Sequence, residues 1–93
     1  MNINQNINKL LYALKLKGQL YKINTYQFYS EKNDKYCTKY QILKKELVEE
    51  FDIEENEIIY REKYALKEEC YSKIDLMKYL AEEHRKGSEA SGE

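Results

Sequence analysis

The residue types that carry out catalysis are scarce in this sequence. His84 is the only histidine, so a Ser-His-Asp or Cys-His site would have to use it. It lies near the end of the last predicted helix, and we interpret it as a surface or half-buried side chain. Cys37 and Cys70 have no sequence neighbour that marks an activated thiol, and cysteine more often fills a small apolar space. We therefore predict no catalytic residue and no enzymatic activity.

Motifs that bind phosphate groups or metals are also missing. The three glycines, Gly18, Gly87 and Gly92, do not form a phosphate-binding loop. Residues 46–57 include seven acids but lack the spacing of a calcium loop. Two cysteines and one histidine make neither a zinc site nor a disulfide framework, so we expect free thiols. We expect no cofactor and no bound metal.

Ten tyrosines, several of them interleaved with lysines, are the most distinctive chemistry of the chain. Aromatic rings can stack on bases while lysines bind phosphates, so such a surface can hold single-stranded nucleic acid. The same rings can pack on a protein partner or on a second copy of the chain. Nucleic-acid-binding motifs are absent and the pI is about 5.9, which favours the protein partner. The candidate interaction surface is Tyr26, Tyr29, Lys32, Lys35, Tyr36, Lys39 and Tyr40.

A predicted β-hairpin over residues 20–42 must position these side chains. Two runs rich in Tyr, Ile, Thr and Phe flank a polar gap that contains Asn33 and Asp34. Aromatic and β-branched residues suit a pleated sheet, and Asn and Asp tolerate turn dihedrals. The apolar side chains of the first run change parity near Asn24-Thr25, which predicts a β-bulge there.

The predicted strands cover about residues 19–30, 35–48 and 58–71. Residues 43–57 are ambiguous, because their apolar side chains fit either a continuing strand or one face of a short helix. We favour a long second strand that ends in an acidic hairpin tip, and a helix over residues 43–51 remains the alternative. A tip at 52–57 brings Cys37 near Cys70, although the sequence leaves that register open. Apolar residues of one parity in the third strand predict one apolar face: Ile58, Tyr60, Tyr64, Leu66 and Cys70.

Two amphipathic helices flank the strands. The first, about 5–17, has an apolar stripe at helical spacing and Asn4 or Asn6 as N-cap, and Gly18 ends it. The second begins at Ser72, which forms a capping pair with Asp75, and is predicted to end near residues 86–87. Its apolar face is predicted to be Ile74, Met77, Leu80 and Ala81. The predicted core is Leu10, Leu11, Leu14, Ile23, Tyr40, Leu66, Met77 and Leu80.

The order α-β-β-β-α predicts a small two-layer α+β domain, in which both helices cover one face of a three-stranded antiparallel meander. We expect one domain over residues 1–87 and a disordered tail over 88–93, because the tail is short and rich in small and polar residues. No apolar run approaches the roughly 20 residues that span a bilayer, and no secretory signal is evident, so the expected location is the cytoplasm, without membrane contact.

Charge is distributed unevenly along the chain. Residues 1–45 hold nine lysines against two acids, whereas residues 46–93 hold seven bases against fifteen acids. Either the two halves attract each other in the fold, or the molecule presents a basic face and an acidic edge. The net charge of −1 disfavours a strongly acidic mimic of nucleic acid.

Three segments, residues 23–30, 36–40 and 71–74, resemble small uncharacterised proteins of phages and mobile elements of low-GC Gram-positive bacteria. The resemblance implies an accessory role, such as binding or inhibiting another protein, and implies no activity or site residue. Our first hypothesis is a protein-interaction module that binds a protein partner or itself, as a homodimer. The alternative is a nucleic-acid-binding accessory protein that uses the Lys/Tyr-rich hairpin.

Overall fold

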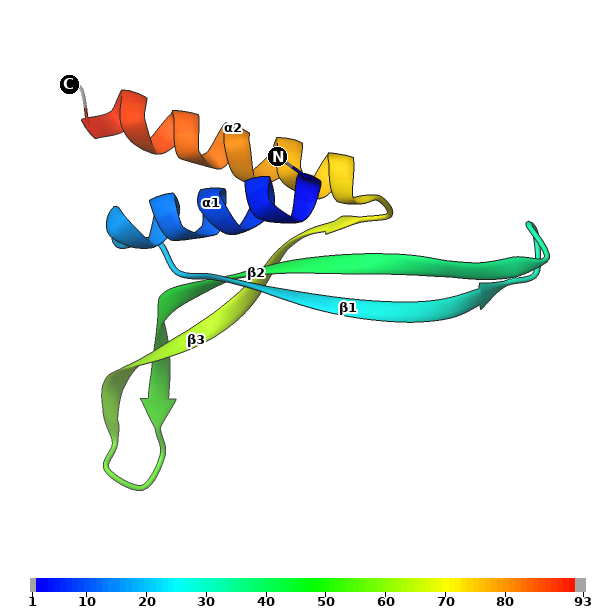
Figure 1. Cartoon of the computed structure of the whole chain (residues 1–93). Coiled ribbons are helices and arrows are strands. Elements are labelled where there is room, and N and C mark those ends of the chain that lie inside the picture. The colour runs from blue at the N-terminus through cyan, green and yellow to red at the C-terminus, as the bar shows by residue number, and fades with distance from the viewer. Residues whose placement is uncertain (1, 92–93) are drawn as a thin grey trace.

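The predicted α+β class is confirmed by the computed structural model, which describes the backbone of residues 2–91 and the side chains of residues 2–86. The strands form an antiparallel meander in the order β1-β2-β3, and both helices lie on one side of it (Figure 1). The elements are α1 (Ile3–Leu16), β1 (Tyr21–Ser30), β2 (Lys35–Asp52), β3 (Glu57–Cys70) and α2 (Lys73–Ser91).

The first helix begins two residues earlier than predicted, because its N-cap is Asn2 and not Asn4 or Asn6. The Gln5 backbone N–H donates to Asn2 Oδ1 at 2.9 Å, and the Asn2 N–H donates to Gln5 Oε1 at 3.2 Å. This reciprocal capping box needs a Glu or Gln three residues after the cap, which only Asn2 has. Gly18, at φ +81°, ends the helix as predicted.

The second helix confirms the predicted cap and corrects the predicted end. Ser72 Oγ accepts a hydrogen bond from the Asp75 N–H at 3.1 Å. The helical backbone runs through Gly87 to Ser91, since a single interior glycine costs only about 1 kcal/mol relative to alanine. Side chains beyond residue 86, and residues 92–93 entirely, lie outside the described part. The domain bounds 1–87 and the disordered tail 88–93 therefore stay predictions.

The hairpin of β1 and β2 pairs without interruption from Tyr21↔Lys44 to Ser30↔Lys35. The predicted bulge near Asn24-Thr25 is therefore wrong. The change of parity has another cause: the helices cover the sheet only near Ile23, and farther out the apolar side chains can lie on the uncovered face.

The long second strand is confirmed, and it continues past residue 48 to Asp52, which excludes the helix over residues 43–51. Its partner β3 pairs with it out to Asp52↔Glu57. At the tip, Asp52 Oδ1 accepts the N–H groups of Glu54 and Glu55, and Asn56 takes a left-handed φ of +53°. Asp34 takes the same left-handed conformation in the first turn, at φ +51°. Both are residue types that tolerate this conformation.

A β-bulge lies in β3 and not in β1. Ile42 pairs with Glu68, while the next residue, Leu43, pairs with Leu66. Lys67 and Glu68 thus both oppose Ile42, and the parity of β3 reverses at this point. Leu66 consequently points to the opposite face from Cys70 and is 51% exposed, so its predicted burial is wrong.

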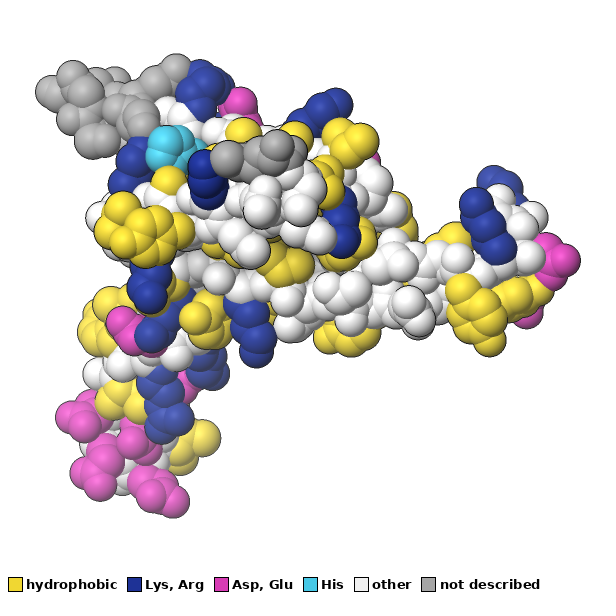
Figure 2. Space-filling model, viewed as in Figure 1, with side chains coloured by type: hydrophobic (Ala, Val, Ile, Leu, Met, Phe, Trp, Pro, Cys, Tyr) yellow, Lys and Arg dark blue, Asp and Glu magenta, His cyan; other side chains and the backbone are white. Residues whose placement is uncertain are grey.

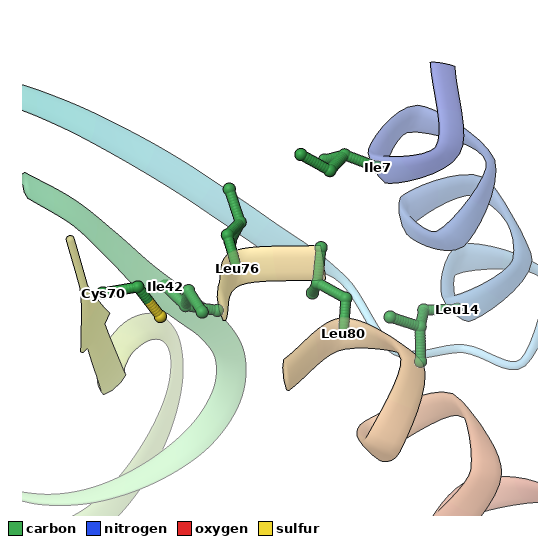
Figure 3. Close-up of a cluster of buried hydrophobic side chains, with 6 residues drawn as sticks. All are labelled: Ile7, Leu14, Ile42, Cys70, Leu76 and Leu80. Carbon is green, nitrogen blue, oxygen red and sulfur yellow. The ribbon is translucent and has the colours of Figure 1, made fainter. Parts of the chain in front are cut away.

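The buried core lies between the two helices and the middle of the sheet (Figure 3), and it consists of Ile7, Leu14, Ile42, Cys70, Leu76 and Leu80. Of the predicted core, Leu14 and Leu80 are buried. Leu10, Leu11, Ile23, Tyr40 and Met77 are half-buried against it. The inward face of α2 is centred on Leu76 and Leu80, whereas Ile74 is 54% exposed, so the predicted face is rotated by part of a turn.

The molecule is far from spherical. Its radius of gyration is 16.8 Å, whereas a compact domain of this length has about 12 Å. Two hairpins account for the difference, because they project from the helices in different directions (Figure 1). We call residues 21–40 the first hairpin and residues 43–66 the second hairpin. The face that contains Ile23 and Ile42 is the helix face, and the opposite face is the open face.

Candidate functional site

The predicted interaction residues all lie on the first hairpin, but they are divided between its two faces. Cross-strand partners share a face, so Tyr26 and Lys39 lie together on the open face, while Tyr29 and Tyr36 lie on the helix face. The other three are Lys35 on the open face, Tyr40 on the helix face and Lys32 in the turn. No single surface gathers these tyrosines and lysines.

Several of these side chains already have partners within the chain. The rings of Tyr29 and Tyr36 meet edge to face, with 5.4 Å between their centroids. The Tyr29 hydroxyl donates to Asp34, which raises the pKa of Tyr29. Lys39 Nζ lies 3.2 Å from Glu69 Oε2, so its charge is compensated. These contacts stiffen the hairpin and leave fewer groups free for a ligand.

The second hairpin presents large apolar side chains on its open face. Across the strands, Leu43 pairs with Leu66 and Phe51 with Ile58, and charged residues pair with the apolar ones between them: Glu62 with Leu47, Glu49 with Tyr60 and Lys45 with Tyr64. Six of the apolar side chains are between 44% and 67% exposed: Leu47, Phe51, Ile58, Tyr60, Tyr64 and Leu66. Several large apolar side chains exposed on one face and bordered by charged residues indicate an interaction surface.

The other face of the same hairpin is ionic. Glu50 pairs with Lys63 and, at 3.3 Å, with Arg61, and the pKa of Glu50 is lowered chiefly by its hydrogen bond to Lys63. Glu46 pairs with Lys67 on this face. The two faces therefore differ in their balance. Ion pairs predominate on this face, whereas the open face carries most of the large apolar side chains together with Glu49 and the Lys45–Glu62 ion pair at 3.0 Å.

The apolar open face continues onto the first hairpin. Phe28 and Tyr71 meet edge to face at 6.3 Å, and Tyr26 lies on the same face two residues before Phe28. Between the two hairpins, the Lys22 ammonium lies 5.9 Å from the centre of the Tyr64 ring. We call this surface the open-face patch: Tyr26, Phe28, Tyr71, Leu43, Leu66, Tyr64, Leu47, Tyr60, Phe51 and Ile58.

Sequence reasoning missed most of this patch although the pattern was visible. The alternation of Ile58, Tyr60, Tyr64 and Leu66 indicates an apolar face, but the shared parity predicts Cys70 on that same face, and Leu66 is predicted to be buried. All five have even numbers, so nothing in the pattern reveals the extra residue at 67–68 that sends them to opposite faces.

A second cluster joins β1 to α2 at Tyr21, Tyr79 and Glu83. Burial, the Glu83 charge and a hydrogen bond to its carboxylate raise the pKa of each tyrosine to about 12, with burial the largest cause. Both phenols are thus neutral at ordinary pH and can donate to the carboxylate. The cluster ties the helix to the sheet.

The thiols and the histidine do not meet. Cys37 pairs across the strands with Phe28, whereas Cys70 pairs with Tyr40, so the two cysteines are not cross-strand partners. Both are free thiols. The His84 backbone carbonyl accepts a hydrogen bond from Lys17 Nζ at 3.2 Å. Among the described side chains, no three histidine, cysteine or acidic residues are arranged to hold a metal ion.

An open groove of about 460 Å³ is lined by residues of both helices. Its floor is apolar, with Leu10, Ala13, Met77 and Ala81, and Lys9 and Lys78 belong to its lining. The groove lacks a group that would fix the orientation of a ligand, such as a buried polar side chain without a partner, among the described residues.

Comparisons of the chain with protein-family models, with curated proteins and with solved structures found no match. In the described part of the chain, neither helix has the length and hydropathy needed to cross a bilayer. The open-face patch must therefore be interpreted from its own geometry.

Proposed function

We propose that this chain is a small protein-interaction module, and not an enzyme, that binds a protein partner or a second copy of itself through the open-face patch. The observation that carries the proposal is the second hairpin, whose open face exposes six large apolar side chains among three charged ones, while ion pairs predominate on its opposite face. A two-stranded hairpin is marginally stable alone and usually needs further strands or a packed surface to cover its apolar side. Tyrosine, phenylalanine and leucine side chains on a projecting arm supply such a contact.

Two further features support the same proposal. The helices cover the sheet only around the core, and both hairpins project beyond them (Figure 1). The hairpins can therefore contact another molecule. An accessory role of this kind is also what the resemblance to small proteins of phages and mobile elements implies.

The alternative, binding of single-stranded nucleic acid by the first hairpin, has less support from the geometry. A stacking platform needs aromatic rings and phosphate-binding cations on one surface. Here Tyr29 and Tyr36 lie on the face opposite Tyr26, and Lys39 is paired with Glu69. Fluorescence anisotropy at about 150 mM salt tests the alternative; tight, salt-sensitive oligonucleotide binding would support it.

The proposed function is tested with a variant of the patch that leaves the monomer intact. Leu47→Ser with Tyr60→Ser removes two side chains that are 67% and 63% exposed, so neither contributes much to the fold. The matched control is Tyr12→Ser, which is also 63% exposed but lies on α1. Light scattering measures self-association, and crosslinking in a lysate of the native host followed by mass spectrometry measures binding to other proteins.

We expect association in the wild type and in the control, and its loss in the double variant. Two results would overturn the proposal: a wild type that associates with no protein at all, or an association that survives in the double variant.

A further inference from the structure

The two hairpins carry opposite charge. Residues 21–40 contain four lysines against two acids, whereas the outer part of the second hairpin, residues 46–63, contains eight acids against two bases. Figure 2 shows the acidic side chains gathered at the free end of the second hairpin. Within residues 49–57 there are six acids and no base, and among the described side chains only Glu50 of these six forms an ion pair. Most of this charge is not neutralised by ion pairs within the described part of the chain.

The first hairpin has the complementary groups on its open face. Lys35 pairs across the strands with Ser30, and no ion-pair partner of Lys35 or Lys32 is found among the described residues. The two acids of this hairpin, Glu31 and Asp34, lie in the turn. The hairpins point in different directions (Figure 1), so the basic one cannot reach the acidic one within the same molecule.

We infer that the partner of the open-face patch is a second copy of this chain, with the basic first hairpin of each copy lying along the acidic second hairpin of the other. This inference rests on the proposed function, and it specifies a second copy of the chain as the protein that binds the open-face patch. A single contact of this kind leaves one basic and one acidic hairpin unsatisfied, and repeating it builds an open filament. A two-fold axis satisfies both hairpins of both copies at once and closes the assembly.

The apolar side chains on the two hairpins suit the same arrangement. Tyr26 and Phe28 of one copy would face Leu47, Phe51 and Tyr60 of the other, and aromatic anchors of this type dominate the energy of protein interfaces. The size is also sufficient. A hairpin of ten residues per strand is about 33 Å long, and a two-stranded ribbon about 10 Å wide. Two such contacts bury about 1,200 Å² in total, the lower end of a stable interface.

Reversing the charge of one hairpin at a time tests this arrangement. Lys32→Glu with Lys35→Glu changes the net charge of residues 21–40 from +2 to −2, so both hairpins are then acidic. Replacing Glu49, Glu54, Glu55 and Glu57 with lysine changes the net charge of residues 46–63 from −6 to +2, so both hairpins are then basic. All six replaced side chains are exposed and outside the ion pairs of the described residues, so the fold should be kept, which circular dichroism and urea midpoints verify. Sedimentation velocity then measures the wild type, each variant alone and their equimolar mixture.

We expect a wild-type dimer whose dissociation constant rises with salt. Each variant alone should dimerise at least about tenfold more weakly, since like charges then face each other. The equimolar mixture should restore the dimer, because each acidic hairpin meets a basic one at both contacts.

Three results would overturn the inference: a monomeric wild type at about 100 μM, reversed variants that dimerise as well as the wild type, or a mixture that does not recover. The proposed function fails separately. A wild type that is monomeric but binds a different host protein, with that binding lost in Leu47→Ser with Tyr60→Ser, refutes the second copy and leaves the interaction module standing.

Discussion

Leu80 and Leu66 are two leucines that the sequence places in one core and the structure separates. Leu80 is fully buried between the helices and the sheet, whereas Leu66 is 51% exposed on the open face. Replacing each with alanine removes the same atoms from different surroundings. The comparison therefore tests the bulge, the docking of α2 and the assignment of the open face together.

The magnitudes follow from burial. Leu80→Ala loses the transfer free energy of the removed methyl and methylene groups and also leaves a cavity, so we expect a loss of about 3–5 kcal/mol in the free energy of unfolding. Leu66→Ala loses about half of the transfer free energy and leaves no cavity, so we expect about 1 kcal/mol. A chain of this length has a total stability of about 5–14 kcal/mol, so the first change approaches unfolding and the second does not.

Urea denaturation followed by far-UV circular dichroism measures both losses. The experiment is run at two protein concentrations, because self-association through the open face would add stability that depends on concentration. Ile74→Ala is the control for α2, since this side chain is 54% exposed on the same helix. Equal losses for Leu66→Ala and Leu80→Ala at the lower concentration would refute the bulge and its placement of the open face. A neutral Leu80→Ala would refute the docking of α2.

Three further predictions concern groups outside the patch. In the native protein, iodoacetamide should label half-buried Cys37 faster than Cys70, whose burial raises its thiol pKa; equal labelling rates by mass spectrometry would contradict this. Tyr21 and Tyr79 have a pKa raised from 10.0 to about 12 in the folded chain, so the stability they contribute is complete below pH 10 and is lost as pH rises from 10 to 12. The melting temperature should fall across that interval, and a flat profile would exclude a contribution of the two protonated tyrosines to stability. Ser72→Ala removes the N-cap of α2 and should lower stability by about 1 kcal/mol in urea denaturation, whereas an unchanged midpoint would show that the cap contributes nothing.

Local patterns were enough to predict the elements and their order. Leu14 follows Ile7, Leu10 and Leu11 at helical spacing, and that stripe is the face of α1 that meets the core. Ser72 with Asp75 marked the start of α2, because the cap depends on side chains three residues apart. Alternation around Ile42 indicated a half-buried strand. Each of these signals lies within one element, so the sequence carries it in full.

Tertiary structure alone decided which apolar residues face the core and which face outward. The bulge at Lys67 depends on how β3 pairs with a strand some 25 residues earlier, and the sequence of β3 keeps the same parity on both sides of it. Leu66 and Cys70 therefore look alike in the sequence but lie on opposite faces. Helical cover is likewise a property of the packed chain. The helices bury Ile42 on the helix face, whereas Phe51 and Tyr60 lie on the open face and stay exposed. Only the assembled fold therefore turns similar strand patterns into a core on one face and a candidate interface on the other.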